Sequence, residues 1–130
     1  MKTLGIDYGE KQIGLAVSDE TMTLAREFGI LSPKEFWNAL KHIIDEHQIS
    51  QIVIGWPLNM DGEETAKTRE VESFKLKVEK ETKLPVEVTD ERLSSVMAQS
   101  ISGQKKDLDS LAAEIILQSY LDKNKTSSHV

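Results

Sequence analysis

The stretch TLGID at Thr3–Asp7 has the pattern of a buried β-strand that ends in a carboxylate. Tyr8 to Lys11 are turn residues, and the apolar run IGLAV at 13–17 follows them. These two segments predict a β-hairpin. A further turn at 19–21 precedes Leu24–Leu31, which we expect to be a third strand although Gly29 weakens its pattern. Three leading strands of this kind predict an antiparallel half of a sheet.

Helices and strands alternate in the rest of the chain. Ser32-Pro33-Lys34-Glu35 predicts a helix start, because serine caps, proline suits the first helical position and glutamate completes a capping box. Pro57 stops the apolar run QIVIGW that precedes it, and the continuous apolarity of that run predicts a central strand. The remaining expected elements are a helix over about Glu63–Thr82, a strand over Pro85–Thr89, and helices over Ser94–Ile101 and Asp107–Leu121.

The order of these elements predicts the fold class. Helices that connect successive strands imply parallel crossovers, which are almost always right-handed. Together with the leading hairpin they give an α/β fold with a mixed five-stranded sheet flanked by helices, which is the arrangement of the ribonuclease H-like fold. The length fits one domain over residues 1–122, followed by a polar tail at 123–130.

Composition excludes several classes of protein. The 130 residues include no cysteine, so disulfides, thiolate metal sites and cysteine nucleophiles are absent. Apolar runs are too short to cross a bilayer and the first residues lead directly into a strand, so we expect a cytoplasmic protein without a membrane segment or leader peptide. The net charge of −6 argues against coating nucleic acid by bulk electrostatics, but not against carboxylates gathered around divalent metals.

Three carboxylates stand at the ends of predicted elements: Asp7, Glu91 and Asp109. Hydrolysis of a phosphodiester by two metal ions needs several carboxylates that converge, and Mg²⁺ prefers such oxygen ligands. Each residue also has an ordinary interpretation. Asp7 could cap the hairpin, Glu91 could lie at a solvated corner, and Asp109 could be a charge favoured by the dipole at a helix start. Asp109 does share an apolar helical face with residues 112, 113 and 116, where an acid needs a partner or a metal.

Other candidate residues lie in the connections. Gly9 would allow backbone to approach a ligand closely beside Asp7. The segment Gly55–Gly62, which includes Asn59, follows a parallel strand, and ligands bind at that end of open sheets. Lys105 and Lys106 precede Asp109 and are placed to meet a phosphate backbone.

Four motifs together resemble the YqgF family of pre-16S rRNA nucleases, whose members are also called Holliday-junction-resolvase-like. The resemblance extends over about residues 3 to 122, and the order and spacing of the motifs make it specific. The motifs are GIDYG at 5–9 with GLAVSD at 14–19, GWPLNMDG at 55–62, DERLSS at 90–95, and DSLAA at 109–113 with ILQSYL at 116–121.

This resemblance implies a ribonuclease H-like fold and a metal-dependent hydrolase that trims the 5′ end of precursor 16S rRNA in ribosome biogenesis. It implies that Asp7, Glu91 and Asp109 form the acidic triad and hold Mg²⁺ or Mn²⁺, as two ions. The implied partners are precursor rRNA and ribosomal particles, with branched DNA as the alternative. We expect five residues to contact the substrate: Gly9, Asn59, Arg92, Lys105 and Lys106.

The chain also departs from its relatives. Many ribonuclease H-like enzymes carry the second acid at the end of the fourth strand, where this chain has Gly55-Trp56-Pro57, so Glu91 would supply it, with Asp90 as a rival. The stretch 101–108 is short and has two bases, where many relatives have a longer basic one. The Asp7 hairpin also resembles the phosphate hairpin of actin-like ATPases and sugar kinases, although those proteins duplicate the fold. A non-catalytic RNA-binding assembly factor is a third alternative.

Overall fold

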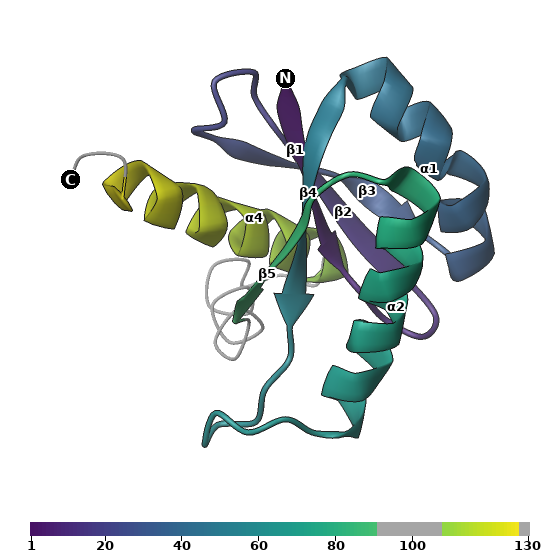
Figure 1. The fold of residues 1–130 in the computed structure, drawn as a ribbon, viewed down its shortest axis with the longest axis vertical. Helices are drawn as coiled ribbons and strands as arrows, with labels where there is room; N and C mark the ends of the chain where they lie inside the picture. The colour runs from purple at the N-terminus through teal and green to yellow at the C-terminus, as the bar shows by residue number, and fades with distance from the viewer. Residues whose placement is uncertain (91–107, 128–130) are drawn as a thin grey trace.

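The computed structural model describes residues 1–90 and 108–127, apart from the side chains of 108–110 and 124–127. Figure 1 shows a central sheet with helices packed on it. The elements in chain order are β1 Lys2–Asp7, β2 Ile13–Ser18, β3 Ala25–Leu31, α1 Pro33–His47, β4 Ile49–Trp56, α2 Ala66–Thr82, β5 Val86–Asp90 and α4 Leu108–Ser127.

The sheet has five strands in the order β3-β2-β1-β4-β5. β1 and β2 pair antiparallel, as do β2 and β3, whereas β4 pairs parallel with both β1 and β5. The predicted antiparallel half and parallel half are therefore confirmed. Because β1, β4 and β5 are parallel, their carboxyl ends share one edge of the sheet, which we call the carboxyl edge.

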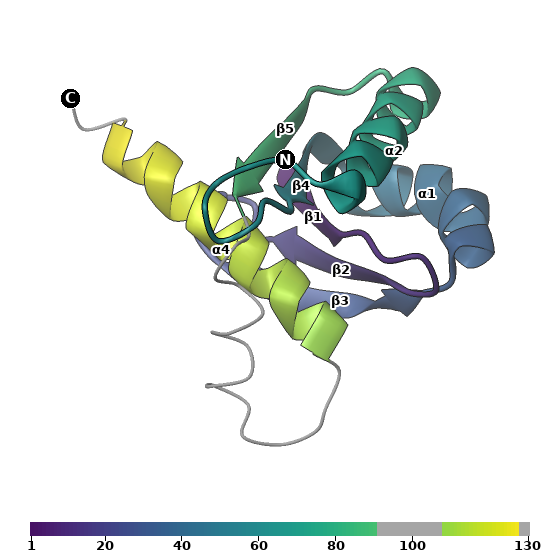
Figure 2. The same cartoon turned by 90° about the horizontal axis from the view of Figure 1, so that it is seen from below.

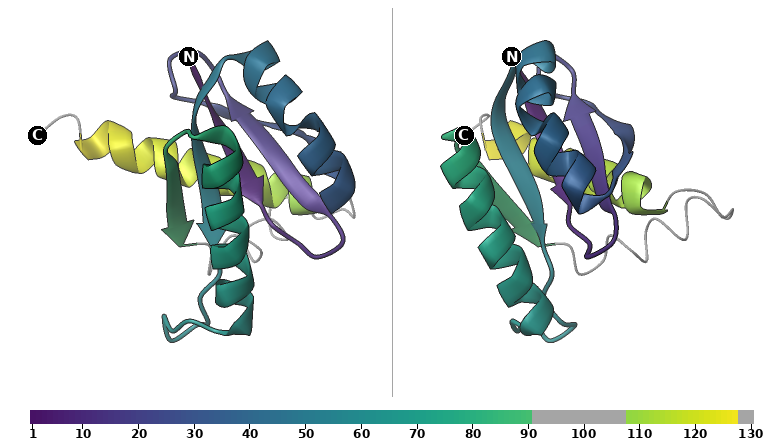
Figure 3. Two further views of the ribbon diagram at one scale, coloured as in Figure 1. Left: turned by 45° about the vertical axis from the view of Figure 1, so that its right-hand side comes forward. Right: turned by 90° about the vertical axis from the view of Figure 1, so that its right-hand side faces the viewer.

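Helices cover both faces of the sheet. Figure 2 shows α1 and α2 on one face and α4 on the other, and Figure 3 shows α4 crossing behind the strands. Two clusters of buried side chains match these layers. On the α1–α2 face, Leu4 and Ile6 of β1 pack with Phe36 and Phe74. On the α4 face, Ala16 and Val53 pack with four residues of α4: Ala113, Ile116, Leu117 and Leu121.

The start of α1 follows from its capping residues. The Ser32 hydroxyl accepts a hydrogen bond from the N–H of Glu35 (3.2 Å), and the Glu35 carboxylate accepts one from the N–H of Ser32 (2.9 Å). Pro33 occupies the first helical position. The hydrogen bond from the Ser32 N–H, and after it the hydrogen bonding of the Ser32 side chain, hold the pKa of the Glu35 carboxyl below its usual value, because they favour its charged form. The predicted capping box is confirmed.

The prediction that the second helix starts near Glu63 is wrong, because α2 begins at Ala66. The residues before it form a closed loop in which Leu58 and Glu64 make an isolated antiparallel bridge. The N–H of Asn59 also donates to the carbonyl of Glu63 (2.9 Å). These contacts require non-helical backbone at 58–64, so the helix starts only after Thr65.

The last helix is longer than its periodicity predicts. We expected Asp107–Leu121, whereas α4 covers Leu108–Ser127. Figure 1 shows its C-terminal part projecting beyond the sheet at β5, where polar residues continue the helix. The helix predicted over Ser94–Ile101 lies outside the described residues. In the described part of the chain, no helix is both long and apolar enough to cross a membrane.

Asp19, at the end of β2, organises the turn before β3. Its carboxylate accepts from the N–H groups of Thr23 (2.9 Å) and Leu24 (3.2 Å), and from the hydroxyls of Thr21 (3.1 Å) and Thr23 (3.1 Å). These hydrogen bonds, led by the one from the Thr23 backbone, lower the pKa of Asp19 from 3.8 to about 2. The carboxylate therefore stabilises the folded state in its charged form.

The lowered pKa predicts an acid-dependent loss of stability. The contribution of the Asp19 charge to the stability of the folded state is fully present above the ordinary pKa of 3.8 and is lost as the pH falls through about 2. We expect Asp19→Asn to melt at a lower temperature than the wild type at pH 7. The difference between the two melting temperatures should narrow continuously between pH 4 and pH 2. A difference that stayed constant over this range would mean that the Asp19 charge does not stabilise the turn.

Candidate functional site

Asp7 is the last residue of β1 and lies on the α4 face of the sheet. Successive strand residues point to opposite faces. Ile6 belongs to the core beneath α1 and α2, whereas Gly5 lies against Leu117 of α4. Asp7 therefore points toward the α4 side, where it is half-buried at the carboxyl edge. This is the placement expected for a strand-end carboxylate that meets a ligand.

Glycines stand on both sides of Asp7, which the sequence alone did not reveal. Gly14 of β2 is its antiparallel partner. On β4, the pair Ile6–Ile54 is the last in register, so Gly55 comes next beside Asp7. Gly55 in turn pairs with the buried Thr89 of β5. Neither glycine carries a side chain that would cover the carboxylate, so β2 and β4 leave room for a ligand beside it. The glycines come beside Asp7 through the register of the strands, which the sequence alone does not give.

The direction of α4 brings its first turn to the same end of the sheet. The side chain of Gln118 accepts from the N–H of Ala25 (2.8 Å), and Glu114, one helical turn earlier, accepts from the N–H of Glu27 (3.0 Å). Residues nearer the start of α4 therefore lie nearer the end of β3. Because β3 runs in the same direction as β1, α4 runs from the carboxyl edge toward the opposite edge.

Asp109 occupies the first turn of α4. Positions 109, 113 and 117 are four residues apart, so their backbones lie on one stripe of the helix. Leu117 and the carbonyl of Ala113 contact β1 at Gly5, which places this stripe on β1. The fold thus brings the backbone of Asp109 to the end of the α4 face where Asp7 lies. Its side chain lies outside the described residues.

Gly9 has a role inside the turn between β1 and β2. A Cβ atom at this position would lie 2.5 Å from the carbonyl oxygen of Gln12, which is too close for any other residue. The glycine therefore permits the tight turn that follows Asp7. This steric requirement explains Gly9 without a ligand, and its contact with substrate stays a prediction.

Asn59 is used to close the loop between β4 and α2. Its Oδ1 accepts from the N–H groups of Asp61 (2.9 Å) and Glu63 (2.9 Å), and its carbonyl accepts from the N–H of Gly62 (2.9 Å). Gly62 has a φ of 84°, the left-handed conformation that glycine adopts most easily. The loop is thus built around the Asn59 side chain, and its predicted substrate contact is untested.

The remaining predicted site residues lie outside the described part of the chain: Glu91, Arg92, Lys105 and Lys106. Within residues 1–90 and the described side chains of α4, no group of three His, Cys, Asp or Glu residues gathers to hold a metal ion. The donor that is described, the half-buried Asp7 carboxylate between two glycine positions of the sheet, fits a hard divalent cation.

Comparison with known proteins identifies the family. Residues 1–123 match the family RuvX, described as Holliday junction resolvase. The chain belongs to this family. The RuvX family is also the YqgF family that the four motifs resemble, so the identification made from the motifs is confirmed.

Two relatives of this RuvX protein are named “Putative pre-16S rRNA nuclease”. The protein from Maridesulfovibrio salexigens is 39% identical over 132 residues, which cover 93% of this chain and 98% of that protein. The protein from Geobacillus thermodenitrificans is 38% identical over 138 residues, covering 96% of this chain and all of that protein. Family and relatives together identify a nuclease, a hydrolase of phosphodiester bonds, and favour this class over the kinase-like alternative.

Solved structures confirm the ribonuclease H-like fold. Thermus thermophilus RuvC in complex with a Holliday junction substrate superimposes with a TM-score of 0.56 at 16% identity, covering 96% of each chain. Fowlpox virus resolvase in complex with Holliday junction DNA gives a TM-score of 0.58 at 13% identity, covering 95% of this chain and 99% of that one.

Proposed function

We propose that this RuvX protein is a metal-dependent nuclease that processes the 5′ end of pre-16S rRNA in the cytoplasm, on precursor rRNA or ribosomal particles. The observation that carries the proposal is the glycine-flanked Asp7 carboxylate, which lies at the end of the sheet face where α4 begins. The name of the relatives at 38–39% identity supports precursor rRNA as the substrate.

Three acids hold the metal in this proposal: Asp7, Glu91 and Asp109. Mg²⁺ or Mn²⁺, as two ions, would activate water and stabilise the leaving oxygen of a phosphodiester. The protein contributes a fixed carboxylate on β1 and a second on the first turn of α4. Because the positions beside Asp7 on β2 and β4 are glycines, a phosphate group could approach from the carboxyl edge.

The strand register supports Glu91 over Asp90 as the remaining acid. Asp90 pairs with Trp56, which packs on the α1–α2 core. By alternation Asp90 belongs to the α1–α2 face, opposite to Asp7. A carboxylate on that face would not join Asp7 at a shared ion, so Glu91 remains the proposed ligand.

The experiment that tests the function compares substrates under metal control. The purified protein is incubated with short RNA that carries a pre-16S 5′ junction, with single-stranded DNA and with a four-way DNA junction. Each substrate is tested with Mg²⁺, with Mn²⁺ and with chelator. We expect metal-dependent cleavage of the RNA. Cleavage of the four-way junction alone would favour a DNA resolvase, which the description of the family makes the second candidate. Metal-independent binding without cleavage would favour an assembly factor.

Lys105 and Lys106 are proposed to hold the phosphate backbone, together with Arg92, Gly9 and Asn59. Changing both lysines to alanine should weaken RNA binding and flatten the dependence of log Kd on log salt concentration by up to about two units of slope. The cleavage rate at saturating RNA should change less. Binding is measured by fluorescence anisotropy at several salt concentrations.

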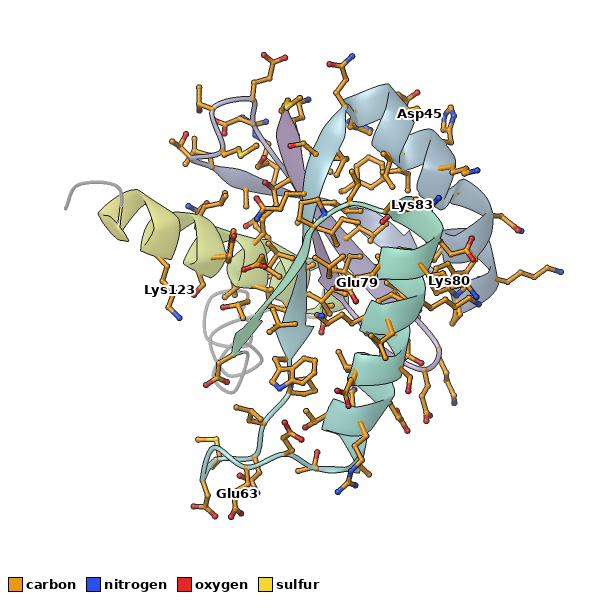
Figure 4. All side chains as sticks on the ribbon, in the orientation of Figure 1. Asp45, Glu63, Glu79, Lys80, Lys83 and Lys123 are labelled. Atoms are coloured by element: carbon orange, nitrogen blue, oxygen red, sulfur yellow. The ribbon has the colours of Figure 1, made fainter. Side chains whose placement is uncertain are left out.

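A matched control removes the same charge elsewhere. Figure 4 shows Lys80 and Lys83 at the end of α2 that is remote from the Glu63 loop. Lys83 has a φ of 58°, so Lys80→Ala is combined with Lys83→Asn, because asparagine tolerates this conformation. This double variant should keep the salt slope of the wild type. Equal slopes in the two double variants would place the substrate path away from Lys105 and Lys106.

A further inference from the structure

An aromatic cluster of Tyr8, Phe36, Trp37 and Phe74 lies on the face of the sheet opposite to the Asp7 carboxylate. The Tyr8 ring lies 4.5 Å from the ring of Phe74, which is 5.4 Å from Phe36 and 5.5 Å from Trp37 between centroids. Phe36 is fully buried and Phe74 is 6% exposed. The cluster therefore joins the residue that directly follows Asp7 to both α1 and α2.

The α1–α2 layer that Tyr8 contacts is linked to the rest of the fold by two further interactions. The Thr68 hydroxyl of α2 donates to the carbonyl of Pro57, which ties α2 to the end of β4. The Lys77 ammonium lies 4.3 Å above the Trp37 ring, a cation–π contact between the two helices. Tyr8 thus packs on a layer in which α2 contacts both the end of β4 and α1.

Tyr8 is also the link between the turn and the core. In the turn at 8–12, Glu10, Lys11 and Gln12 are exposed, whereas Tyr8 packs against the buried cluster of the α1–α2 face. The main chain thus has Asp7 directed to one face and the ring of Tyr8 fastened on the other.

We propose that Tyr8 is a positioning residue that sets the Asp7 carboxylate through packing of its ring on Phe74. The proposal rests on the nuclease function proposed above. Active-site groups must be held to within about half an ångström, and the loss of a supporting contact typically costs 10- to 100-fold in metal affinity or activity.

The test compares Tyr8→Leu, which keeps an apolar side chain but removes the ring, with Tyr8→Phe, which removes only the hydroxyl. We expect Tyr8→Leu to weaken Mn²⁺ binding, measured by calorimetry, about tenfold and to lower kcat about 10- to 100-fold, with KM for RNA within about twofold. Tyr8→Phe should stay within about threefold of the wild type in all three. An equal loss in both variants would assign the effect to the hydroxyl and overturn the packing proposal.

Trp37→Leu is the matched control for a merely structural effect. This variant removes another ring of the same cluster. The Trp37 ring contacts Phe36, Phe74 and Lys77 but makes no ring contact with Tyr8. We expect a lower melting temperature with wild-type Mn²⁺ affinity. The proposal is overturned if Tyr8→Leu binds Mn²⁺ like the wild type, or if Trp37→Leu loses as much affinity. A wild type that binds Mn²⁺ but cleaves nothing would refute the nuclease, while the affinities would still decide the role of Tyr8.

Discussion

Asp7→Asn is expected to lower metal-dependent cleavage by at least about a hundredfold. The substitution keeps the size of the side chain and removes one ligand charge from the proposed metal site. Asp7 is half-buried, and its neighbours on β2 and β4 are Gly14 and Gly55. Neither of these strands therefore carries a carboxylate beside Asp7 that could replace it. The measurement is the single-turnover cleavage rate, at saturating Mg²⁺ or Mn²⁺, of the substrate that the wild-type protein cleaves.

The other proposed acids should behave in the same way. Glu91→Gln and Asp109→Asn are expected to lose at least about a hundredfold each, whereas Asp90→Asn should retain activity because its position faces α1 and α2. An active Glu91→Gln together with an inactive Asp90→Asn would show that the second acid is Asp90.

Thermal melting separates metal binding from chemistry. A metal-ion concentration of ten times the dissociation constant stabilises the folded state by about 1.4 kcal/mol. For a domain of this size, this raises the melting temperature by roughly 3–6 °C. Wild type should show this shift and Asp7→Asn should lose most of it. An identical shift in both proteins would place the metal away from Asp7.

Gly5→Ala is expected to destabilise the protein by disturbing the packing of α4 on β1. The new Cβ would lie 2.7 Å from Cβ of Leu117, 3.3 Å from its Cδ2 and 3.4 Å from the carbonyl of Ala113. Two of these three atoms are close to or part of the helix backbone, so α4 itself must move. Overpacking of this kind costs about 1–3 kcal/mol of stability. A shift of α4 would also displace Asp109 and lower the cleavage rate.

Gly29→Ala makes the same chemical change without the clash. Gly29 is in β3, and a Cβ at this position would have no atom within 4 Å. We expect its melting temperature and cleavage rate to stay near those of the wild type, while both fall in Gly5→Ala. If Gly5→Ala melted like Gly29→Ala, the close packing of α4 on β1 would be wrong.

Much of the fold could be predicted from local patterns. The strand at Thr3–Asp7 and the helix start at Ser32 depend on residues that are neighbours in the chain, so a short buried run and capping chemistry were sufficient. The strand-end position of Asp7 followed from the same reasoning. Its neighbours did not, since Gly14 and Gly55 reach Asp7 only through the register of three strands.

The errors arose where tertiary contacts override local preference. Glu63 and Glu64 are good helix formers, yet hydrogen bonds to Asn59 hold this segment as a loop and delay α2 to Ala66. The end of α4 was placed too early because its apolar residues stop at Leu121, whereas the polar residues that follow continue the helix to Ser127.

From its long-range packing we expect α4 to dock late in folding. Gln118 and Glu114 accept hydrogen bonds from the N–H groups of Ala25 and Glu27 across 93 and 87 residues, so these bonds form only after a large loop has closed. Before that step, a chain with a complete sheet and its α1–α2 layer would leave Ala16 and Val53 uncovered and would lack the third proposed acid. A newly made molecule would therefore gain its cutting activity last, when α4 docks, and a refolding chain would recover its β-sheet signal before it recovers cleavage.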